Sequence, residues 1–369
     1  MSEQLPKVSV IFLLYNAENT VGRLVDAILK QRHPDYKDQS AWLEVLFMDD
    51  GSRDSTPEKL KLALLRHGSP AHLKPVINSE NLGLSRTLNK AFALIHSPYG
   101  LTCHLDCFFG REDYVSEMLR LMESRPDAAA ITGQPAIEPD QPMPLAEKVN
   151  LVANLMDIFP AETASELLPV GFAEGRCDIF RKEALQAAGY YDTTLRTAGE
   201  DQLLAARMRE KGYEIYQAPG LPYYLSVSEE QNSLWKLLKH QHLFGRTQPY
   251  ILLSNRKSLA GIVGESAGGN RRARMVLRIS QLLSCMAYFA ALAGVLAHLP
   301  AWLWSLPLIL TLLLKLKVFG RHLGRVQFSG REMGVFWAIQ PFLDVYYAAG
   351  LMQGVLSFLR GQPEGKTIT

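Results

Sequence analysis

The chain has 369 residues, and its 39 Lys and Arg against 37 Asp and Glu give a formal net charge of +2. This length fits one large or two medium domains, and a charge so near zero excludes a general electrostatic attraction to nucleic acid. The four cysteines show neither C-x-x-C spacing nor a disulfide framework, so we interpret them as buried thiols in a reducing compartment.

The first 220 residues alternate between patterns typical of strands and of helices. Residues 8–14 form a nearly continuous apolar run, as expected for a strand buried on both faces, and residues 19–31 have helical spacing. Further strands are predicted at 44–48, 75–78, 101–106 and 178–180, and further helices at 56–66, 85–95 and 113–123. The alternation predicts an α/β fold with a Rossmann-like, mostly parallel sheet, helices on both faces, and ligands bound where strands end.

Polar side chains follow these predicted strands. The first strand runs into Tyr15-Asn16-Ala17-Glu18, and the second into Asp49-Asp50-Gly51-Ser52. Carboxylates at such a place can accept hydrogen bonds from a ribose or a base. The segment Asn81-Leu82-Gly83-Leu84-Ser85 then opens a helix whose N-terminal amides can face phosphates.

In combination and in this order, these segments resemble family 2 glycosyltransferases with the GT-A fold. The resemblance covers about residues 7–220 and rests on VSVIFLLYNAENTV, VLFMDDGSRDST, NLGLSRTLNKA, LDCFFGREDYV and the stretch from CDIFRKEAL to YQAP. It implies transfer of a sugar from a nucleotide-diphosphate donor with inversion. The donor-binding residues that it implies are Tyr15, Glu18, Asp50 and Asp106, and Arg86 is expected to bind the donor with them.

The segment Gly199-Glu200-Asp201 opens a predicted helix, and an acid at a helix N-terminus is stabilised as the anion. The resemblance places the catalytic base at Asp201, where it would deprotonate the acceptor hydroxyl. Without the resemblance, Glu200 and Asp201 would indicate only that a helix begins with two acidic residues. Contacts with the acceptor or the diphosphate are expected from Glu174, Arg176 and Glu200.

The segment Asp106-Cys107-Phe108 departs from the family pattern, which has Asp-x-Asp at the end of this strand and holds Mg²⁺ or Mn²⁺ with the last carboxylate. Phe108 cannot bind such a cation, and a thiolate at Cys107 would suit softer metals. Three alternatives stay open. Asp106 holds the metal together with phosphate oxygens, basic residues such as Arg86 or Arg246 replace it, or the site has lost its activity.

The C-terminal third is apolar. Residues 279–314 contain no Asp, Glu, Lys or Arg, and residues 334–359 contain only Asp344. A span needs about 20 apolar residues, so we expect a two-span hairpin that turns near residues 298–300, and a third span after it. The basic residues at both ends of the hairpin and the absence of a secretory signal predict a cytoplasmic first domain. The alternative is a buried helical pair in a soluble domain.

The predicted domains are therefore a GT-A domain at 1–225, an amphipathic interfacial helix with a basic connector at 226–278, and about three transmembrane helices at 279–360. On the interfacial helix, His242 and Arg246 are expected to reach the donor diphosphate or a lipid phosphate. Contact with anionic lipid alone is an equal alternative.

The resemblance extends to a membrane-anchored subgroup similar to exopolysaccharide (succinoglycan-type) glycosyltransferases. It implies an enzyme of the inner (cytoplasmic) membrane that binds a nucleotide-sugar donor, a lipid-linked or glycan acceptor and membrane lipids, but no nucleic acid. The alternatives are a polyprenyl-phosphate glycosyltransferase and a non-catalytic scaffold that binds nucleotide sugars. A nucleotidyltransferase ranks lower, because no Gly-rich phosphate loop follows the first strand.

Overall fold

The computed structural model describes residues 5–137, 143–155, 166–195, 199–225, 233–254 and 271–360. The chain forms two compact units. The first consists of Met1–Asp140 and Ile158–Ser226, and the second of Gln141–Asp157 and Val227–Thr369. Of the predicted interfacial helix and basic connector at 226–278, residues 226–232 and 255–270 lie outside the described residues.

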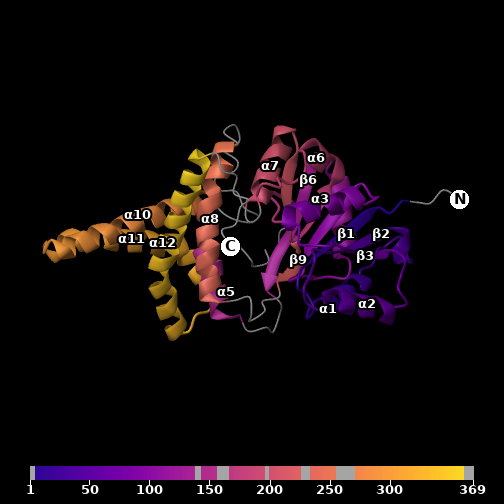
Figure 1. Cartoon of the computed structure of the whole chain (residues 1–369), viewed down its shortest axis with the longest axis horizontal. Coiled ribbons are helices and arrows are strands. Elements are labelled where there is room, and N and C mark those ends of the chain that lie inside the picture. Colours follow the sequence, from indigo (N-terminus) through magenta and orange to yellow (C-terminus); the bar gives the residue numbers. More distant parts are fainter. Residues whose placement is uncertain are drawn as a thin grey trace. The chain divides into compact units, whose positions relative to one another are not determined.

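A nine-stranded sheet is the centre of the first unit (Figure 1). Its strands are β1 (Val8–Leu14), β2 (Leu43–Asp49), β3 (Leu73–Ile77), β4 (Tyr99–His104), β5 (Cys107–Phe109), β6 (Ala128–Ile137), β7 (Leu168–Pro169), β8 (Cys177–Arg181) and β9 (Glu214–Leu225). Their order is β3-β2-β1-β4-β8-β6-β9-β5, with β7 paired to β9. The predicted α/β class is confirmed. The sheet is mixed, because β8 runs antiparallel to both of its neighbours, β4 and β6.

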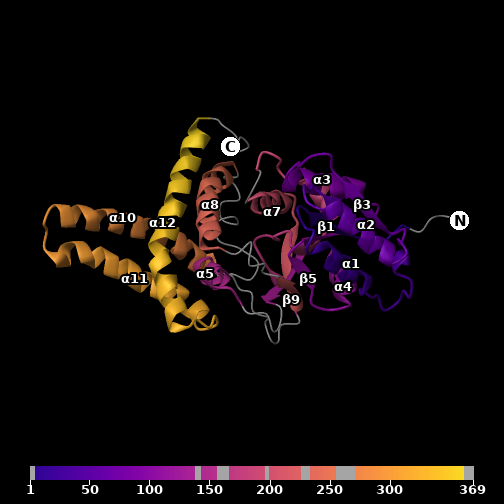
Figure 2. The same ribbon diagram turned by 60° about the horizontal axis from the view of Figure 1, so that its bottom comes forward.

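Helices cover both faces of this sheet, which explains why every residue of β1 is buried. The helices of this unit are α1 (Val21–Leu29), η1 (Gln39–Ala41), α2 (Thr56–Arg66), α3 (Leu84–Leu94), α4 (Tyr114–Ser124), α6 (Lys182–Ala187) and α7 (Glu200–Glu210). On one face, Ile11 and Leu13 of β1 belong to an apolar core shared with α3, α6 and α7. The intervening Phe12 points to the opposite face and stacks on Phe47, with ring centroids 5.0 Å apart. Figures 1 and 2 show α3 and α7 on one side of the sheet and α1 on the other.

The strand order reverses at β1. The chain moves from β1 outward through β2 to β3, and then returns to place β4 on the other side of β1. In open α/β sheets the crevice at such a reversal, outside the carboxyl ends of the strands, is where ligands bind. The loops that follow β1 and β4 therefore frame the expected site.

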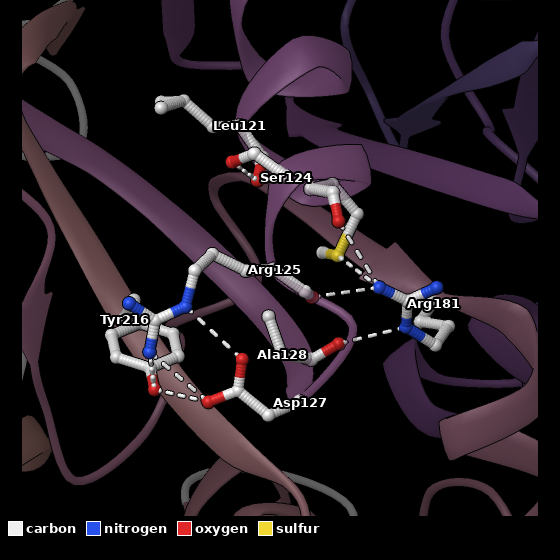
Figure 3. Close-up of polar contacts among 8 residues, drawn as sticks. Leu121, Ser124, Arg125, Asp127, Ala128, Arg181 and Tyr216 are labelled. Atoms are coloured by element: carbon white, nitrogen blue, oxygen red, sulfur yellow. Dashed lines mark hydrogen bonds and ion pairs between the residues drawn. The ribbon is translucent and has the colours of Figure 1, made fainter.

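An arginine at the end of β8 closes the junction between α4 and β6 (Figure 3). Arg181 donates from Nη2 to the carbonyl of Arg125 at 2.9 Å and from Nε to the carbonyl of Ala128 at 2.9 Å. The Arg125 carbonyl also accepts the Ala128 N–H at 3.0 Å, so the guanidinium adds a second donor at the end of α4, where carbonyls lack partners inside the helix. Beside it, Asp127 pairs with Arg125 at 3.0 Å and accepts from the Tyr216 hydroxyl at 2.5 Å.

The second unit is helical and consists of α5 (Leu145–Ala153), α8 (Leu234–Ser254), α10 (Arg271–Leu296), α11 (Ala301–Leu323) and α12 (Gly330–Leu359). By length and composition, Val276–Leu296, Ala301–Gly320 and Gly330–Leu359 can each cross a membrane. The hairpin between the first two turns at residues 297–300, where the sequence predicts it. These apolar helices fit association with a membrane.

A buried ion pair joins these three apolar helices. Lys315 of α11 pairs with Asp344 of α12, and Tyr288 of α10 donates its hydroxyl to the same carboxylate at 2.8 Å. Lys315 and Asp344 are 3% and 1% exposed. The acid inside the last apolar run is therefore compensated by a cation and a hydroxyl from its neighbours, as its cost in an apolar medium requires.

Glycines bring α8 and α12 together, backbone against backbone. A Cβ atom at Gly245 of α8 would collide with the carbonyl of Tyr347, and one at Gly350 or Gly354 of α12 would collide with backbone atoms of α8. Small residues at a helix contact permit this close approach. The helix predicted to lie at the membrane interface is thus packed along a helix that is long and apolar enough to span the membrane.

Candidate active site

The loops after β1 and β2 are fastened to one another. The Asn16 N–H donates to Ser52 Oγ at 2.9 Å, and the Ala17 N–H donates to Thr56 Oγ1 at 2.7 Å. Ser52 also donates from its N–H to the buried carboxylate of Asp49 at 3.3 Å, and burial raises the pKa of that carboxyl. The floor of the crevice is therefore rigid on the β1 and β2 side.

Asp50 organises the loop that precedes α3. Its carboxylate accepts the backbone N–H groups of Leu82 and Gly83 at 2.9 and 3.0 Å, the Thr87 hydroxyl at 2.6 Å and the Asn78 amide at 3.0 Å. Asp50 is 8% exposed. Its predicted contact with the donor stays a prediction, whereas its function as a brace for this loop follows from the geometry.

The other residues predicted to bind the donor lie on exposed parts of the same edge. Tyr15 is 39% exposed, and Arg86 is exposed on the first turn of α3. Glu18 pairs with Lys59 at 3.3 Å, and both line a cavity of about 200 Å³ between α1 and α2, which Arg23 also lines. This volume is below the usual range for a small-molecule ligand.

The turn between β4 and β5 carries Asp106. The next residue but one, Phe108, lies in β5 and is 4% exposed. The guanidinium carbon of Arg23 lies 3.6 Å from the centroid of the Phe108 ring, which is the geometry of a cation–π contact. The Arg23 guanidinium of α1 therefore lies over Phe108, the residue at the position of the second acid of the family motif.

These residues do not fit a preformed site for a divalent cation. Asp106 is the one carboxylate of the incomplete motif, and the buried Cys107 beside it offers sulfur, which a hard cation such as Mg²⁺ does not prefer. Across the described ranges, no three His, Cys, Asp or Glu side chains gather so that they could hold a metal ion. The expected Mg²⁺ or Mn²⁺ stays a prediction.

Two acids begin α7, as the sequence predicts. Glu200 is 9% exposed, and Asp201 accepts the Gln202 N–H at 2.7 Å. Burial raises the pKa of both carboxyl groups, and the charge of Glu200 raises the pKa of Asp201 further. Asp201 is therefore a stronger base than an exposed aspartate.

The loop before β8 brings two further predicted residues to these acids. Glu174 and Arg176 form an ion pair with Nε and Oε2 3.3 Å apart. After burial and Glu200, the charge of Glu174 also raises the pKa of Asp201. Arg176 and Asp106 both act on the pKa of His104, so Asp106, Glu174, Arg176, Glu200 and Asp201 share one electrostatic environment.

A buried aspartate in β8 holds this loop. Asp178 accepts the Gly175 N–H at 2.6 Å and the Thr132 hydroxyl at 2.5 Å. Burial raises the pKa of Asp178 to about 7. Sequence reasoning missed Asp178 and also two buried neighbours of the loop, His104 and Tyr191, because their proximity to Gly175 is spatial and leaves no motif.

His242 and Arg246 belong to α8 of the second unit. Burial lowers the pKa of His242, and Arg246 lowers it further, so the imidazole favours its neutral form. Contacts of these two residues with a donor diphosphate or a lipid phosphate stay predictions.

Residues 9–189 match the profile of the family described as glycosyl transferase family 2. No curated protein matches the sequence significantly. Among solved structures, the chain is similar to the mannosyltransferase PcManGT from Pyrobaculum calidifontis in complex with GDP-Man and Mn²⁺. The identity is 17%, the TM-score is 0.63, and 95% of this chain and 87% of that chain are covered. It also matches S. aureus TarS 1–349 in complex with UDP-GlcNAc, with 16% identity, a TM-score of 0.47, and coverage of 96% of this chain and 92% of that chain.

The chain thus contains a glycosyl transferase family 2 domain, and its fold is of the GT-A type with three C-terminal helices that could cross a membrane. The fold predicted from the sequence is confirmed. The family 2 domain supports glycosyltransferase activity.

Proposed function

We propose that this protein transfers a sugar, with inversion, from a nucleoside-diphosphate donor to an acceptor hydroxyl at a membrane. The observation that carries the proposal is the pair Glu200 and Asp201 at the start of α7, with Glu200 buried and Asp201 half-buried, in one electrostatic environment with Glu174 and Arg176. Buried acids with raised pKa values in a crevice are typical of catalytic sites.

In this reaction Asp201 is the general base. The acceptor oxygen bonds to the anomeric carbon as its proton passes to the Asp201 carboxylate, and the bond from that carbon to the diphosphate oxygen breaks with its electron pair on the leaving group. A base works best when its pKa lies near the working pH, and the raised pKa of Asp201 moves it in that direction. A single displacement of this kind inverts the anomeric configuration.

The donor is expected at the strand ends after β1, β2 and β4, where Tyr15, Glu18, Asp50 and Asp106 follow their strands. Arg86 at the start of α3 is the cation assigned to the diphosphate. A divalent cation bound with the donor would supply the same neutralisation with Asp106 as its ligand, and no step depends on it here.

The acceptor is proposed to be lipid-linked, in the synthesis of an exopolysaccharide or another surface glycan at the inner membrane, with the first unit in the cytoplasm. The three apolar helices support a membrane location. A general base at Asp201 suits a neutral hydroxyl acceptor, since an ionised polyprenyl phosphate needs no base.

The test is a donor screen of the purified full chain in nanodiscs with a lipid extract, read as released nucleoside diphosphate. Wild type should turn over one nucleotide sugar, and Asp201→Asn should lower turnover by about 10²–10⁴-fold. Glu210→Gln, at the exposed far end of the same helix, is the matched control. Near-normal turnover by Asp201→Asn would favour the phosphate acceptor, and no turnover of any donor by wild type would favour a binding scaffold.

A further inference from the structure

Three buried polar atoms of the first unit have no hydrogen-bond partner among the described residues. Two of them lie near Gly175 in the loop before β8, and the third belongs to Glu200, whose charge acts on the pKa of Tyr191. They are Nε2 of His104, the hydroxyl of Tyr191 and Oε2 of Glu200. A buried polar group without a partner costs about 1–3 kcal/mol, so native proteins rarely retain one without a reason. Three such groups beside one crevice indicate a ligand that satisfies them.

The glycine at the tip of this loop shows that two of these atoms face a common space. A Cβ atom at Gly175 would lie 3.9 Å from His104 Nε2 and 4.0 Å from the Tyr191 hydroxyl oxygen. Apart from Gly175 itself and its chain neighbours Glu174 and Arg176, no other atom of the described residues comes within 4 Å of that position. Both polar atoms therefore border the space that the absent side chain of residue 175 leaves open.

The backbone holds these groups in place. Tyr191 donates its N–H to the Asn89 side chain at 3.0 Å, and its carbonyl accepts from the same amide at 2.9 Å. The His104 N–H donates to the Arg176 carbonyl at 3.0 Å. Since neighbouring backbone groups are paired in this way, the unpaired side-chain atoms do not result from a poorly packed loop.

The chemistry of these atoms fits hydroxyl groups. Burial raises the pKa of Tyr191, so its phenol keeps its proton, and Nε2 of His104 is a ring nitrogen that can take part in a hydrogen bond. An imidazole nitrogen and a phenol hydroxyl suit ligands that both donate and accept hydrogen bonds. Sugar hydroxyls donate and accept at once.

We propose that His104 and Tyr191 form a subsite beside Gly175 that binds hydroxyl groups of a sugar, next to the acids Glu200 and Asp201. This inference rests on the proposed function and extends it to two residues that bind the sugar itself. The same chemistry serves the sugar of the donor or a sugar of the acceptor, and the experiment separates these two sources.

The experiment compares Tyr191→Phe and His104→Asn with matched controls in the full-length protein in nanodiscs. Tyr190→Phe removes a phenol hydroxyl from the adjacent, partly buried tyrosine. His104→Gln can place an amide nitrogen near the position of Nε2, whereas Asn reaches only the position of Nδ1. Melting temperatures of all four variants establish that they fold.

The first arm measures, by calorimetry, the affinity for the nucleotide sugar that wild type turns over and for its nucleoside diphosphate alone. GDP-mannose, UDP-glucose, UDP-galactose and UDP-GlcNAc are the donors screened. If the subsite binds the donor sugar, Tyr191→Phe and His104→Asn weaken nucleotide-sugar binding about tenfold each and leave nucleoside-diphosphate binding unchanged. Tyr190→Phe binds both ligands as wild type does, and His104→Gln recovers part of the loss.

The second arm measures transfer to the lipid extract. If the subsite binds the acceptor, donor affinity and donor hydrolysis stay at the wild-type level, and KM for the acceptor rises about tenfold in the same two variants. An active wild type with folded variants that match it in both arms would overturn the inference and leave the proposed function intact. A wild type that turns over no donor would overturn the proposed function, and this inference with it.

Discussion

Replacing Asp50 by asparagine tests whether this carboxylate braces the crevice. One oxygen of Asp50 accepts from Asn78, Leu82 and Thr87, and among the described residues the other accepts only from the Gly83 N–H at 3.0 Å. In the Asp50→Asn variant, the new amide nitrogen would face either the single donor or the three donors. The better orientation keeps the amide oxygen facing the three donors. The variant then loses the hydrogen bond from the Gly83 N–H and the negative charge.

A hydrogen bond to a charged group contributes about 1.5–3 kcal/mol, so we expect Asp50→Asn to lower the free energy of unfolding by about 3 kcal/mol. For a domain of this size that is a fall in melting temperature of roughly 6–12 °C. The assay is thermal unfolding of the full chain in detergent, beside binding of the nucleoside diphosphate.

Thr87→Val supplies the matched control, because it removes one donor at 2.6 Å from the same carboxylate. It should cost about 1–2 kcal/mol, and the double variant should lose less than the sum because the two residues share a bond. A melting temperature of Asp50→Asn within about 2 °C of wild type, together with lost nucleotide affinity, would refute the brace and assign Asp50 to the ligand.

Three further predictions concern charges. Glu200→Gln should shift the acidic limb of the pH–rate profile to lower pH, because it removes a charge that raises the pKa of Asp201. An acidic limb that does not move would argue against Asp201 as the base. The pKa of Asp178 in the folded protein is about 7, above its ordinary value of 3.8. Stability should therefore fall by about 4 kcal/mol as the pH rises from 4 through 7, and denaturation of Asp178→Asn should lack this pH dependence. Asp344→Asn should destabilise the protein in thermal unfolding by about 3–5 kcal/mol because Lys315 loses its counter-charge, and Lys315→Met combined with Asp344→Leu should recover most of the loss.

The strands that the sequence predicts well are the continuous apolar ones. The predicted strand at residues 8–14 coincides with β1, and the helix predicted at 56–66 coincides with α2. Two long strands were missed. β9 contains Pro219, Gly220 and Pro222, and β6 contains Gly133 and Pro135, residues that argue against a strand interior. The direction of β8 was not predictable either, because pairing depends on residues distant in the chain.

The acids of the site could be predicted because each follows a strand or begins a helix. Asp106 and Asp201 lie where the sequence places them. His104 and Tyr191 could not be found in this way, since what distinguishes them is a shared space beside Gly175. The sequence also did not predict that α5 belongs to the helical second unit. Packing between helices that are distant in the chain leaves no local sequence pattern.

The glycine contact between α8 and α12 gives the second unit a fixed register. Two helices that meet at Gly245, Gly350 and Gly354 cannot slide past one another without separating along their whole contact. His242 and Arg246 of α8, whose backbones touch these glycines, thus keep a constant height relative to α12. If α12 is anchored in a bilayer, its depth of insertion alone sets how far above the lipid these two side chains operate.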